Sequence, residues 1–156
     1  MFDFASDSRN EGDTPGRNDK GLVTYDRVTR KDAFHWYKAN WSASPTVHIA
    51  QQRYNPRSGG NVAVRVYSNL PHIELKVNGA SQGVQTSNEH IFTFNITLPP
   101  GATTLVEACG SVASSRVCDA VSWTALPLDI GGRDPEHGRC ALRSPQAREQ
   151  DTLCLR

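Results

Sequence analysis

One stretch of this chain, residues 72–84, limits most strongly the folds that the chain can adopt. Its first six residues read His-Ile-Glu-Leu-Lys-Val, so a strand here has an aliphatic face and a polar, mainly charged face. Asn78-Gly79 then supplies the two positive-φ residues of a tight hairpin turn, and a second run leaves the turn immediately. The stretch therefore predicts an antiparallel β-hairpin.

The same alternation continues on both sides of the hairpin. Short alternating strands separated by turn residues are typical of an antiparallel sandwich in which each sheet buries one face. We therefore predict a mainly β fold, an immunoglobulin-like antiparallel β-sandwich over residues 43–125, preceded by a short helix. The expected strands are residues 46–51, 62–67, 73–77, 80–85, 91–98, 104–109 and 117–123.

The two ends of the chain differ from this pattern and are expected to be separate units. Residues 1–42 begin with a short apolar segment at 1–5 that could form a strand, and a long polar loop follows. Residues 126–156 show neither a strand nor a helix period and too few apolar residues to offset the entropy of ordering. We expect this tail to be disordered, and we consider the hypothesis that it is not native to the fold.

A helix is predicted between the polar loop and the first sandwich strand. Residues 32–40 carry Asp32 as a cap candidate, and Phe34, Tyr37 and Trp41 are spaced three and four residues apart. So many aromatic residues on one short helix need a large partner surface. The partner would be the edge of the sandwich or a further domain.

Composition excludes several functional classes. The formal net charge is +1 and the basic residues are scattered singly, so no nucleic-acid surface is expected. No apolar run is long enough to span a bilayer and no signal peptide opens the chain, so we expect a soluble protein with no membrane association. The compartment of a parent enzyme stays open and includes the periplasm and the exterior.

The cysteines and histidines do not predict a metal centre. The four cysteines lack the C-x-x-C spacing of zinc sites, and the five histidines lie far apart in the sequence. Cys109 and Cys118 could face each other across a hairpin, but two free thiols is the preferred interpretation. No metal and no cofactor is expected.

Several motifs in order resemble one enzyme family. Residues 2–13 read Phe-Asp-Phe-Ala-Ser-Asp-Ser-Arg-Asn-Glu-Gly-Asp, residues 18–27 read Asn-Asp-Lys-Gly-Leu-Val-Thr-Tyr-Asp-Arg, and residues 31–34 read Lys-Asp-Ala-Phe. Together they resemble the end of the catalytic barrel in β-galactosidases of glycoside hydrolase family 2. Residues 66–69, Val-Tyr-Ser-Asn, and residues 77–79, Val-Asn-Gly, resemble the sandwich that follows this barrel.

The resemblance implies a position for the first residues beside a sugar pocket. Residues 1–5 would be the eighth barrel strand, and the loop after it would lie at the carboxyl end of the barrel, where active sites are found. Phe2 would form an aromatic wall of a galactose pocket. Asn18, Asp19 and Lys20 would lie on the loop that approaches the sugar hydroxyls.

The resemblance also implies that the catalytic residues lie outside this chain. Retaining enzymes of this family use two glutamates about 5 Å apart, and the family carries both on barrel strands that precede the matched segment. None of the glutamates here occupies a matching motif. We therefore predict no catalytic residues in this chain. Met1 would be an internal residue of a longer enzyme.

The aromatic residues of the predicted helix leave two interpretations open. Trp36, Tyr37 and Trp41 could form a sugar-stacking platform, or they could pack the helix against the barrel of a parent enzyme, which is the preferred interpretation. The expected function is that of a carboxy-terminal β-galactosidase fragment, inactive alone, whose sandwich is a structural accessory domain. The alternatives are a carbohydrate-binding module and a protein-interaction domain that self-associates through an exposed edge or the aromatic helix.

Overall fold

The computed structural model describes residues 1–5, 16–18, 20–113 and 115–127, and every structural statement below refers to these residues. They form one ten-residue helix, α1 (Asp32–Trp41), and nine strands. Two of these are the short strands β1 (Phe4–Ala5) and β2 (Arg17–Asn18). The others are β3 (Val47–Ile49), β4 (Gly60–Ser68), β5 (His72–Val77), β6 (Ala80–Thr86), β7 (Ile91–Leu98), β8 (Thr103–Val112) and β9 (Ser115–Thr124).

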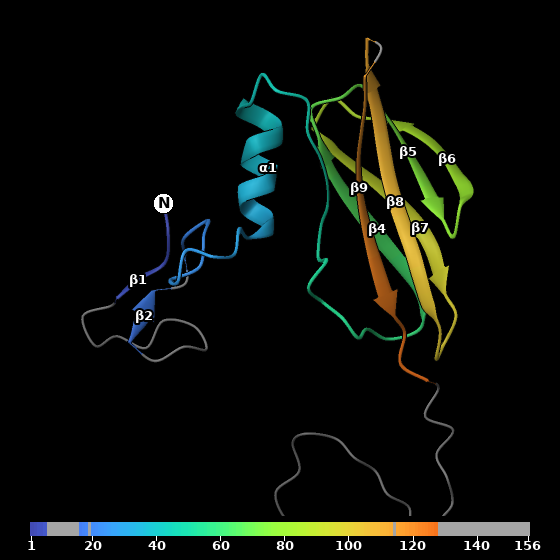
Figure 1. Cartoon of the computed structure of the whole chain (residues 1–156), viewed down its shortest axis with the longest axis horizontal. Helices are drawn as coiled ribbons and strands as arrows, with labels where there is room; N and C mark the ends of the chain where they lie inside the picture. Colours follow the sequence, from blue (N-terminus) through green and yellow to red (C-terminus); the bar gives the residue numbers. More distant parts are fainter. Residues whose placement is uncertain (6–15, 19, 114, 128–156) are drawn as a thin grey trace, which may run out of the picture.

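The seven strands β3 to β9 form a sandwich of two antiparallel sheets. One sheet has the order β3-β4-β7 and the other has the order β6-β5-β8-β9. Each predicted strand is present, with ends that differ by a few residues at most. Figure 1 shows α1 beside the sandwich, with β1 and β2 on the far side of the helix. The prediction of a mainly β sandwich with a short preceding helix is confirmed.

The hairpin that limits the fold has the predicted turn. Val77 pairs with Ala80, and the two residues between them, Asn78 and Gly79, have φ values of 49° and 82°. Positive φ at both central positions is the requirement of the tight hairpin turn that the Asn-Gly pair favours. The side chain of Asn78 also accepts a hydrogen bond from the amide of Leu105, 2.9 Å away, which fixes the turn against β8.

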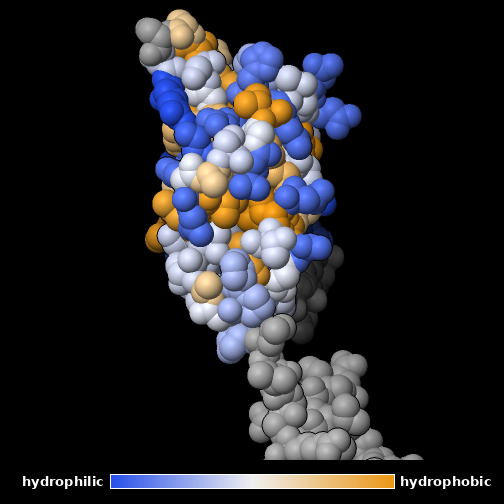
Figure 2. Space-filling view, turned by 90° about the vertical axis from the view of Figure 1, so that its right-hand side faces the viewer, coloured by the Kyte–Doolittle hydropathy of each residue, from blue (hydrophilic) through white to orange (hydrophobic). Residues whose placement is uncertain are grey.

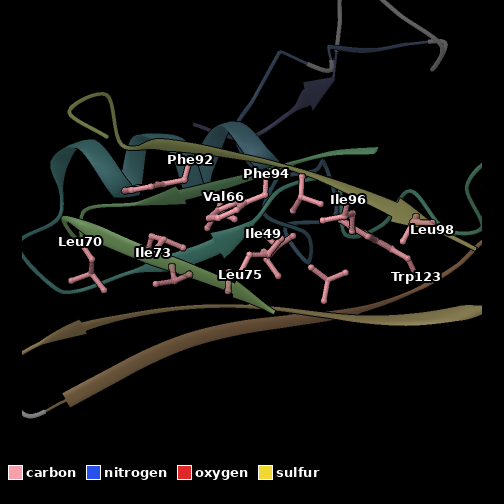
Figure 3. Packing of buried hydrophobic residues seen from close by; sticks show 14 of the residues in the cluster. Ile49, Val66, Leu70, Ile73, Leu75, Phe92, Phe94, Ile96, Leu98 and Trp123 are labelled. Atoms are coloured by element: carbon pink, nitrogen blue, oxygen red, sulfur yellow. The ribbon is translucent and has the colours of Figure 1, made fainter. Parts of the chain in front are cut away.

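The core lies between the inner faces of the two sheets (Figure 3). Alternate residues of β4, β5, β7 and β8 point inward, which explains the alternating pattern in the sequence. Trp123 closes one end of this core and is 1% exposed. The buried apolar residues of the core cluster are Val47, Ile49, Val64, Val66, Leu70, Ile73, Leu75, Phe92, Phe94, Ile96, Leu98, Val106, Ala108, Trp123 and Ala125.

Strand β6 differs from the other sandwich strands because all seven of its residues are exposed. It forms the outer edge of the four-stranded sheet and pairs only with β5. Val84 on this strand is 62% exposed. The face of the molecule opposite α1 shows apolar residues among the polar ones (Figure 2). A strand of this kind leaves one row of backbone groups available for pairing.

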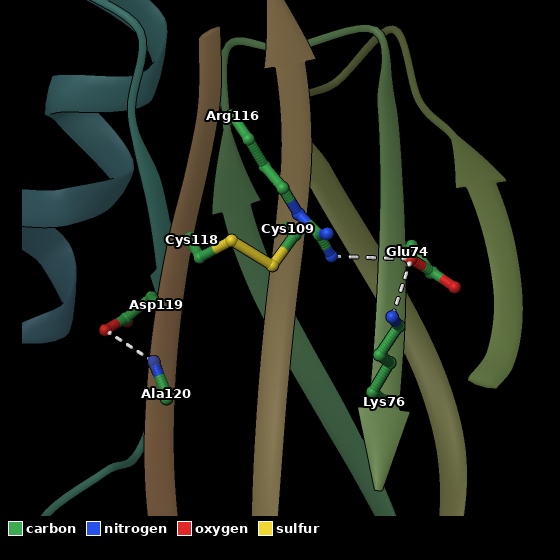
Figure 4. Close-up of a disulfide and its surroundings, with 7 residues drawn as sticks. All are labelled: Glu74, Lys76, Cys109, Arg116, Cys118, Asp119 and Ala120. Carbon is green, nitrogen blue, oxygen red and sulfur yellow. Dashed lines mark hydrogen bonds and ion pairs between the residues drawn. A yellow bond between two sulfur atoms is a disulfide. The ribbon is translucent and has the colours of Figure 1, made fainter. Parts of the chain in front are cut away.

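Cys109 and Cys118 form a disulfide, so the preference for two free thiols is wrong. They are directly opposite each other on β8 and β9, with 4.2 Å between their Cα atoms. Figure 4 shows the bond lying across the two strands, beside the ion pairs that Glu74 makes with Lys76 and Arg116. The register of the β8–β9 hairpin therefore decides the state of these cysteines.

The two ends of the described chain modify three further expectations. The segment at residues 1–5 forms strand only at Phe4–Ala5, and Phe2 makes a parallel bridge with Val23. Asp32 is not the cap of α1, since the cap residue is Lys31, and the Asp32 carboxylate bonds elsewhere. The tail prediction falls mainly on residues 128–156, outside the described residues, although Leu126 donates a backbone hydrogen bond to Arg57.

Candidate functional site

The first residues and the end of the polar loop lie together, as the sugar-pocket hypothesis requires. Asn18 pairs with Phe4 in the β1–β2 sheet, and Lys20 is exposed two residues later. Gly21 lies so close to the backbone of Phe2 that a Cβ atom would stand 2.3 Å from the Phe2 carbonyl carbon. Only glycine fits there. Asp19, the fourth predicted residue, lies outside the described residues.

Phe2 presents an aromatic surface at this place. Its side chain is 46% exposed, and the guanidinium carbon of Arg27 lies 4.6 Å from the ring centroid. An aromatic face with one open side suits the apolar face of a sugar ring, and the cation beside it favours an electron-rich or anionic ligand. The predicted role of Phe2 as a pocket wall stays a prediction.

The carboxylate of Asp3 holds the end of the loop. It accepts a hydrogen bond from the Gly21 amide at 2.8 Å and from the Lys31 ammonium at 2.7 Å. The Lys31 hydrogen bond holds the pKa of Asp3 below its usual value, and the Gly21 amide adds to the effect. The loop end, the first strand and the residue before α1 are therefore joined at one carboxylate.

Helix α1 has two faces with different partners. Asp32, His35 and Ala39 face the sandwich, where Ala39 is 1% exposed and His35 stacks on a histidine of β3. Tyr37 and Trp41 lie on the opposite side, with ring centroids 4.6 Å apart, and Trp41 is 77% exposed. This arrangement favours packing of the aromatic face against another part of a larger enzyme.

Trp36 lies between these two faces and joins the aromatic group. Its ring meets the Tyr37 ring edge-on, with 5.0 Å between the centroids. Tyr37 therefore contacts both of the other predicted aromatic residues, Trp36 and Trp41. Their assignment to sugar stacking or to an interface stays a prediction.

His48 on β3 forms the centre of an unpredicted polar cluster between α1 and the sandwich. Its Nδ1 atom lies 3.3 Å from Asp119 on β9, and its Nε2 atom lies 3.6 Å from Asp32 on α1. The ring stacks on that of His35, with 3.5 Å between the centroids and 12° between the planes. Three elements therefore meet at one imidazole.

The two carboxylates of this cluster also bond to the backbone. Asp119 accepts a hydrogen bond from the Ile49 amide at 2.8 Å and another from the Gln52 side chain. Asp32 accepts one from the Gln51 amide at 2.9 Å. Because β3 pairs with only one strand, Asp119 satisfies an amide on its open edge.

The cluster gives its two histidines opposite proton affinities. Burial disfavours a charged His48, but the neighbouring carboxylates of Asp119 and Asp32 outweigh burial, so its pKa is raised. Burial and the neighbouring His48 charge lower the pKa of His35 to about 4. The His48 ring, 3.6 Å away, holds the pKa of Asp32 below its usual value, and the hydrogen bond from the Gln51 amide adds to the effect. In Asp119, where burial acts in the opposite direction, His48 and the Ile49 amide still lower the pKa.

Comparison with known proteins places this arrangement in an enzyme family. A family described as "Domain of unknown function (DUF4982)" matches residues 59–118, which lie within the sandwich. The β-glucuronidase of Bacteroides fragilis is 46% identical over 91 residues, which is 58% of this chain and 13% of that protein. The crystal structure of an FMN-binding β-glucuronidase from Faecalibacterium prausnitzii matches 81% of this chain, and 19% of its own, with a TM-score of 0.72 and 42% identity.

The chain belongs with the carboxy-terminal part of glycoside hydrolase family 2 enzymes. The crystal structure of a putative β-galactosidase from Bacteroides fragilis matches 81% of this chain and 19% of its own, at a TM-score of 0.74 and 35% identity. The chain spans only 13% to 19% of the length of these three proteins. Their names include both β-glucuronidase and β-galactosidase, so the similarity does not select between the two sugars.

The family 2 resemblance of the sequence is therefore confirmed, but it did not reveal the histidine cluster. His35 and His48 lie far apart in the sequence, and no motif marks Asp119. The sequence pattern indicates only on which face each residue lies. Asp32 and His35 share one face of the helix, and His48 lies on the outer face of its strand. The described residues contain no group of three or more His, Cys, Asp or Glu side chains placed to hold a metal ion.

We expect the attachment of α1 to the sandwich to weaken above neutral pH. Because the folded pKa of His48 is raised, its contribution is complete below about pH 6.5 and is lost as the pH rises through the folded value. We expect the exchange protection of the α1 amides to fall about tenfold between pH 6 and pH 9. Hydrogen exchange followed by nuclear magnetic resonance measures this.

The acid side of the profile has the opposite origin. His35 resists protonation until about pH 4 in the folded state, so stability falls as the pH drops from about 6.5. The contributions of Asp32 and Asp119 are lost only as the pH falls through their lowered values. His48→Gln should remove the alkaline loss, whereas His72→Gln, at an exposed position on β5, should retain it. Equal protection at pH 6 and pH 9 in the unmodified chain would contradict the assignment.

The ten residues of α1 do not form a membrane span, and no other described helix is long and apolar enough to cross a bilayer.

Proposed function

We propose that this chain supplies the end of the catalytic barrel and the adjoining accessory sandwich of a glycoside hydrolase that acts on terminal β-linked glucuronides. The sandwich is the accessory domain, and residues 1–42 carry one side of the sugar pocket. Support comes from the juxtaposition of Phe2 with the loop end at Lys20–Gly21 and from the β-glucuronidases that the chain matches.

The charge at the loop end favours a uronic acid over a neutral sugar. A glucuronide carries a carboxylate where a galactoside carries a neutral hydroxymethyl group. A lysine ammonium forms a short charge-assisted hydrogen bond with a carboxylate, which is about twice as strong as a neutral hydrogen bond. Lys20 lies beside Gly21 and is exposed, so a cationic side chain stands at this side of the pocket. The proposal selects the glucuronide, and the expected galactoside stays the alternative substrate, since one similar crystal structure is of a putative β-galactosidase.

The catalytic carboxylates of the reaction belong elsewhere in such an enzyme. Retaining glycosidases need two carboxyl groups about 5 Å apart on either side of the scissile bond. The glutamates that the structure describes, Glu74, Glu89 and Glu107, all lie in the sandwich. Glu74 is paired with Lys76 and Arg116 on the outer face of its sheet. We therefore assign binding, not bond cleavage, to the described residues.

Replacing Lys20 tests the substrate proposal. In a chimera of the Bacteroides fragilis β-glucuronidase, residues 1–127 of this chain replace the matching stretch. We expect the chimera to hydrolyse 4-nitrophenyl β-glucuronide faster than the galactoside. Lys20→Met should lower kcat/KM for the glucuronide about 30- to 100-fold, because a charge-assisted hydrogen bond is lost. Initial rates with both substrates measure the effect.

A matched lysine provides the control for this experiment. Lys76→Met changes a lysine on β5, which lies in the sandwich, and should alter kcat/KM less than twofold. A chimera that prefers the galactoside, or one in which both lysine variants behave alike, would contradict the proposal. The comparison uses chimeras with the same melting temperature, so that folding does not enter the result.

A second role, self-association, is favoured by the exposed edge strand β6. All seven residues of this strand are exposed, and Val84 is 62% exposed. Two copies could pair their β6 edges through backbone hydrogen bonds. Sedimentation of the chain over a range of concentrations distinguishes this role from the accessory role alone. Binding of galactosides or glucuronides by the isolated chain would instead favour a carbohydrate-binding module that uses Trp41.

A further inference from the structure

A continuous set of ion pairs and hydrogen bonds connects the proposed sugar-facing loop end to the sandwich. We propose that Asp3, Asp32 and Asp119 are positioning residues that together hold the loop end at Gly21 in place relative to strand β9. This inference rests on the proposed function for its purpose, but the linkage itself is a property of the described residues. The accessory sandwich would then contribute to substrate binding without touching the sugar.

The first link joins the loop end to the residue that precedes α1. Asp3 accepts hydrogen bonds from the Gly21 amide and from the Lys31 ammonium, at 2.8 and 2.7 Å. Its side chain is only 9% exposed. Both bonds go to one oxygen, Oδ1, so removing this carboxylate leaves the Gly21 amide without its acceptor.

The second link is the backbone around Lys31. The Lys31 amide donates to the carbonyl of Leu22, and the Lys31 carbonyl accepts from the amide of Phe34 in α1. The Leu22 amide in turn donates to Met1. The loop end, the first strand and the start of the helix therefore move together, because every link between them is a hydrogen bond of 3.1 Å or less.

The third link attaches the start of α1 to the sandwich. Asp32 accepts from the Gln51 amide and lies 3.6 Å from His48. Asp119 approaches His48 from the other side and also accepts from the Ile49 amide. In Figure 4, Asp119 follows directly after the disulfide residue Cys118, and its carboxylate points to the side on which α1 lies.

Helix α1 depends on these links for its place. A helix of ten residues is marginal in water without tertiary contacts. Ala39 is its only buried residue, and the stacked rings of His35 and His48 provide a close contact with β3. Because so little apolar area holds the helix, loss of the charged contacts should release it while the sandwich core stays intact.

Hydrogen exchange of the full 156-residue chain tests the linkage. The reporters are the amides of Leu22, Lys31 and Phe34, which are hydrogen-bonded in the linkage, and core amides of β4 and β7 serve as the reference. Asp119→Ala should raise exchange of all three reporters about tenfold, because a charge-assisted contact is lost. The core amides should change less than twofold, and Asp119→Glu should restore part of the protection.

The control and a second variant separate positioning from general destabilisation. Glu107→Gln, on β8 of the same sheet, should leave the reporters unchanged. In a chain that already carries Asp3→Ala, Asp119→Ala should no longer raise exchange of the Gly21 amide, because that amide has already lost its acceptor. Equal increases at reporters and core, or an unchanged Leu22 amide in the single Asp119→Ala variant, would overturn the inference.

The outcome is independent of the proposed substrate. If Asp119→Ala releases the reporters but the Lys20 experiment shows no preference for the glucuronide, the proposed function fails and the linkage stands. If the chimera cleaves the glucuronide and Asp119→Ala leaves the reporters protected, the linkage fails alone. When both hold, Asp119→Ala in the chimera should raise KM for the glucuronide about threefold to tenfold with a smaller change in kcat.

Discussion

Replacing Trp123 with alanine should lower the free energy of unfolding of this chain by about 3–5 kcal/mol. Trp123 is 1% exposed and closes one end of the core, so its removal leaves a cavity that its neighbours fill only in part. The guanidinium carbon of Arg57 also lies 3.9 Å from the centroid of the Trp123 ring. The substitution therefore removes both apolar packing and the aromatic face against which a buried cation rests.

Arg57 makes this position unusually sensitive. Arg57 is only 4% exposed, and burial lowers the pKa of its guanidinium. Its Nε atom donates to the Tyr54 carbonyl at 3.2 Å, whereas the buried Nη1 atom has no hydrogen-bond partner among the described residues. A cation–π contact of this kind contributes about 2 kcal/mol when it is desolvated. The cycle Trp123→Leu with Arg57→Met should show a coupling of about 1–2 kcal/mol.

Urea unfolding followed by circular dichroism measures the Trp123 effect. The matched control is the same substitution at Trp41, which is 77% exposed on α1, and it should change the free energy of unfolding by less than about 0.5 kcal/mol. Equal effects at the two tryptophans would contradict the assignment of Trp123 to the core. Trp123→Phe should give an intermediate loss, because it keeps an aromatic face for Arg57.

The strands of the sandwich could be predicted because each carries its own signal. In a strand of alternating apolar and polar residues, the apolar residues are predicted to face the core. The apolar residues of β7 do so: Phe92, Phe94, Ile96 and Leu98 are buried. The Asn78-Gly79 turn is a local requirement of the backbone and needs no knowledge of the remaining chain. Features of this kind can be predicted from a single sequence.

The contacts between α1 and the sandwich could not be predicted in this way. Asp32, His48 and Asp119 are separated by 16 and 71 residues, the differences between their numbers, and none belongs to a motif. Their meeting depends on how the helix lies on the sandwich, which is a tertiary fact. The error at Asp32 has the same cause: a carboxylate at a helix start is a good cap, but here the Gln51 amide and His48 bind it instead.

The state of the cysteines depended on one hairpin register. Val112 pairs with Ser115, and this pairing places Cys109 opposite Cys118. The turn reads Val-Ala-Ser-Ser and lacks the Asn-Gly or Asp-Gly pair that marks a tight hairpin turn. Ala113 has a φ of 51°, and an alanine does not predict a positive φ. A shift of one residue would have separated the two thiols, so the sequence could not decide between them.

Loss of the Cys109–Cys118 disulfide should destabilise the chain by about 2–3 kcal/mol, because the bond closes a loop of roughly ten residues and limits the unfolded state. Since disulfides persist in oxidising compartments, the full stability should be reached only under oxidising conditions. We expect the double variant Cys109→Ala with Cys118→Ala to unfold at a lower urea concentration than the oxidised chain. Urea unfolding with and without a thiol reductant measures the difference.

The reductant supplies the internal control for this prediction. Reduction should lower the midpoint of the unmodified chain to that of the double variant, whose own midpoint should not respond to the reductant. Because Asp119 directly follows Cys118, loss of the bond should also reduce protection of the Ile49 amide, which donates to Asp119. If reduction did not change the urea midpoint, the two cysteines would not pair in solution. The contacts between β9 and α1 would then not depend on the disulfide.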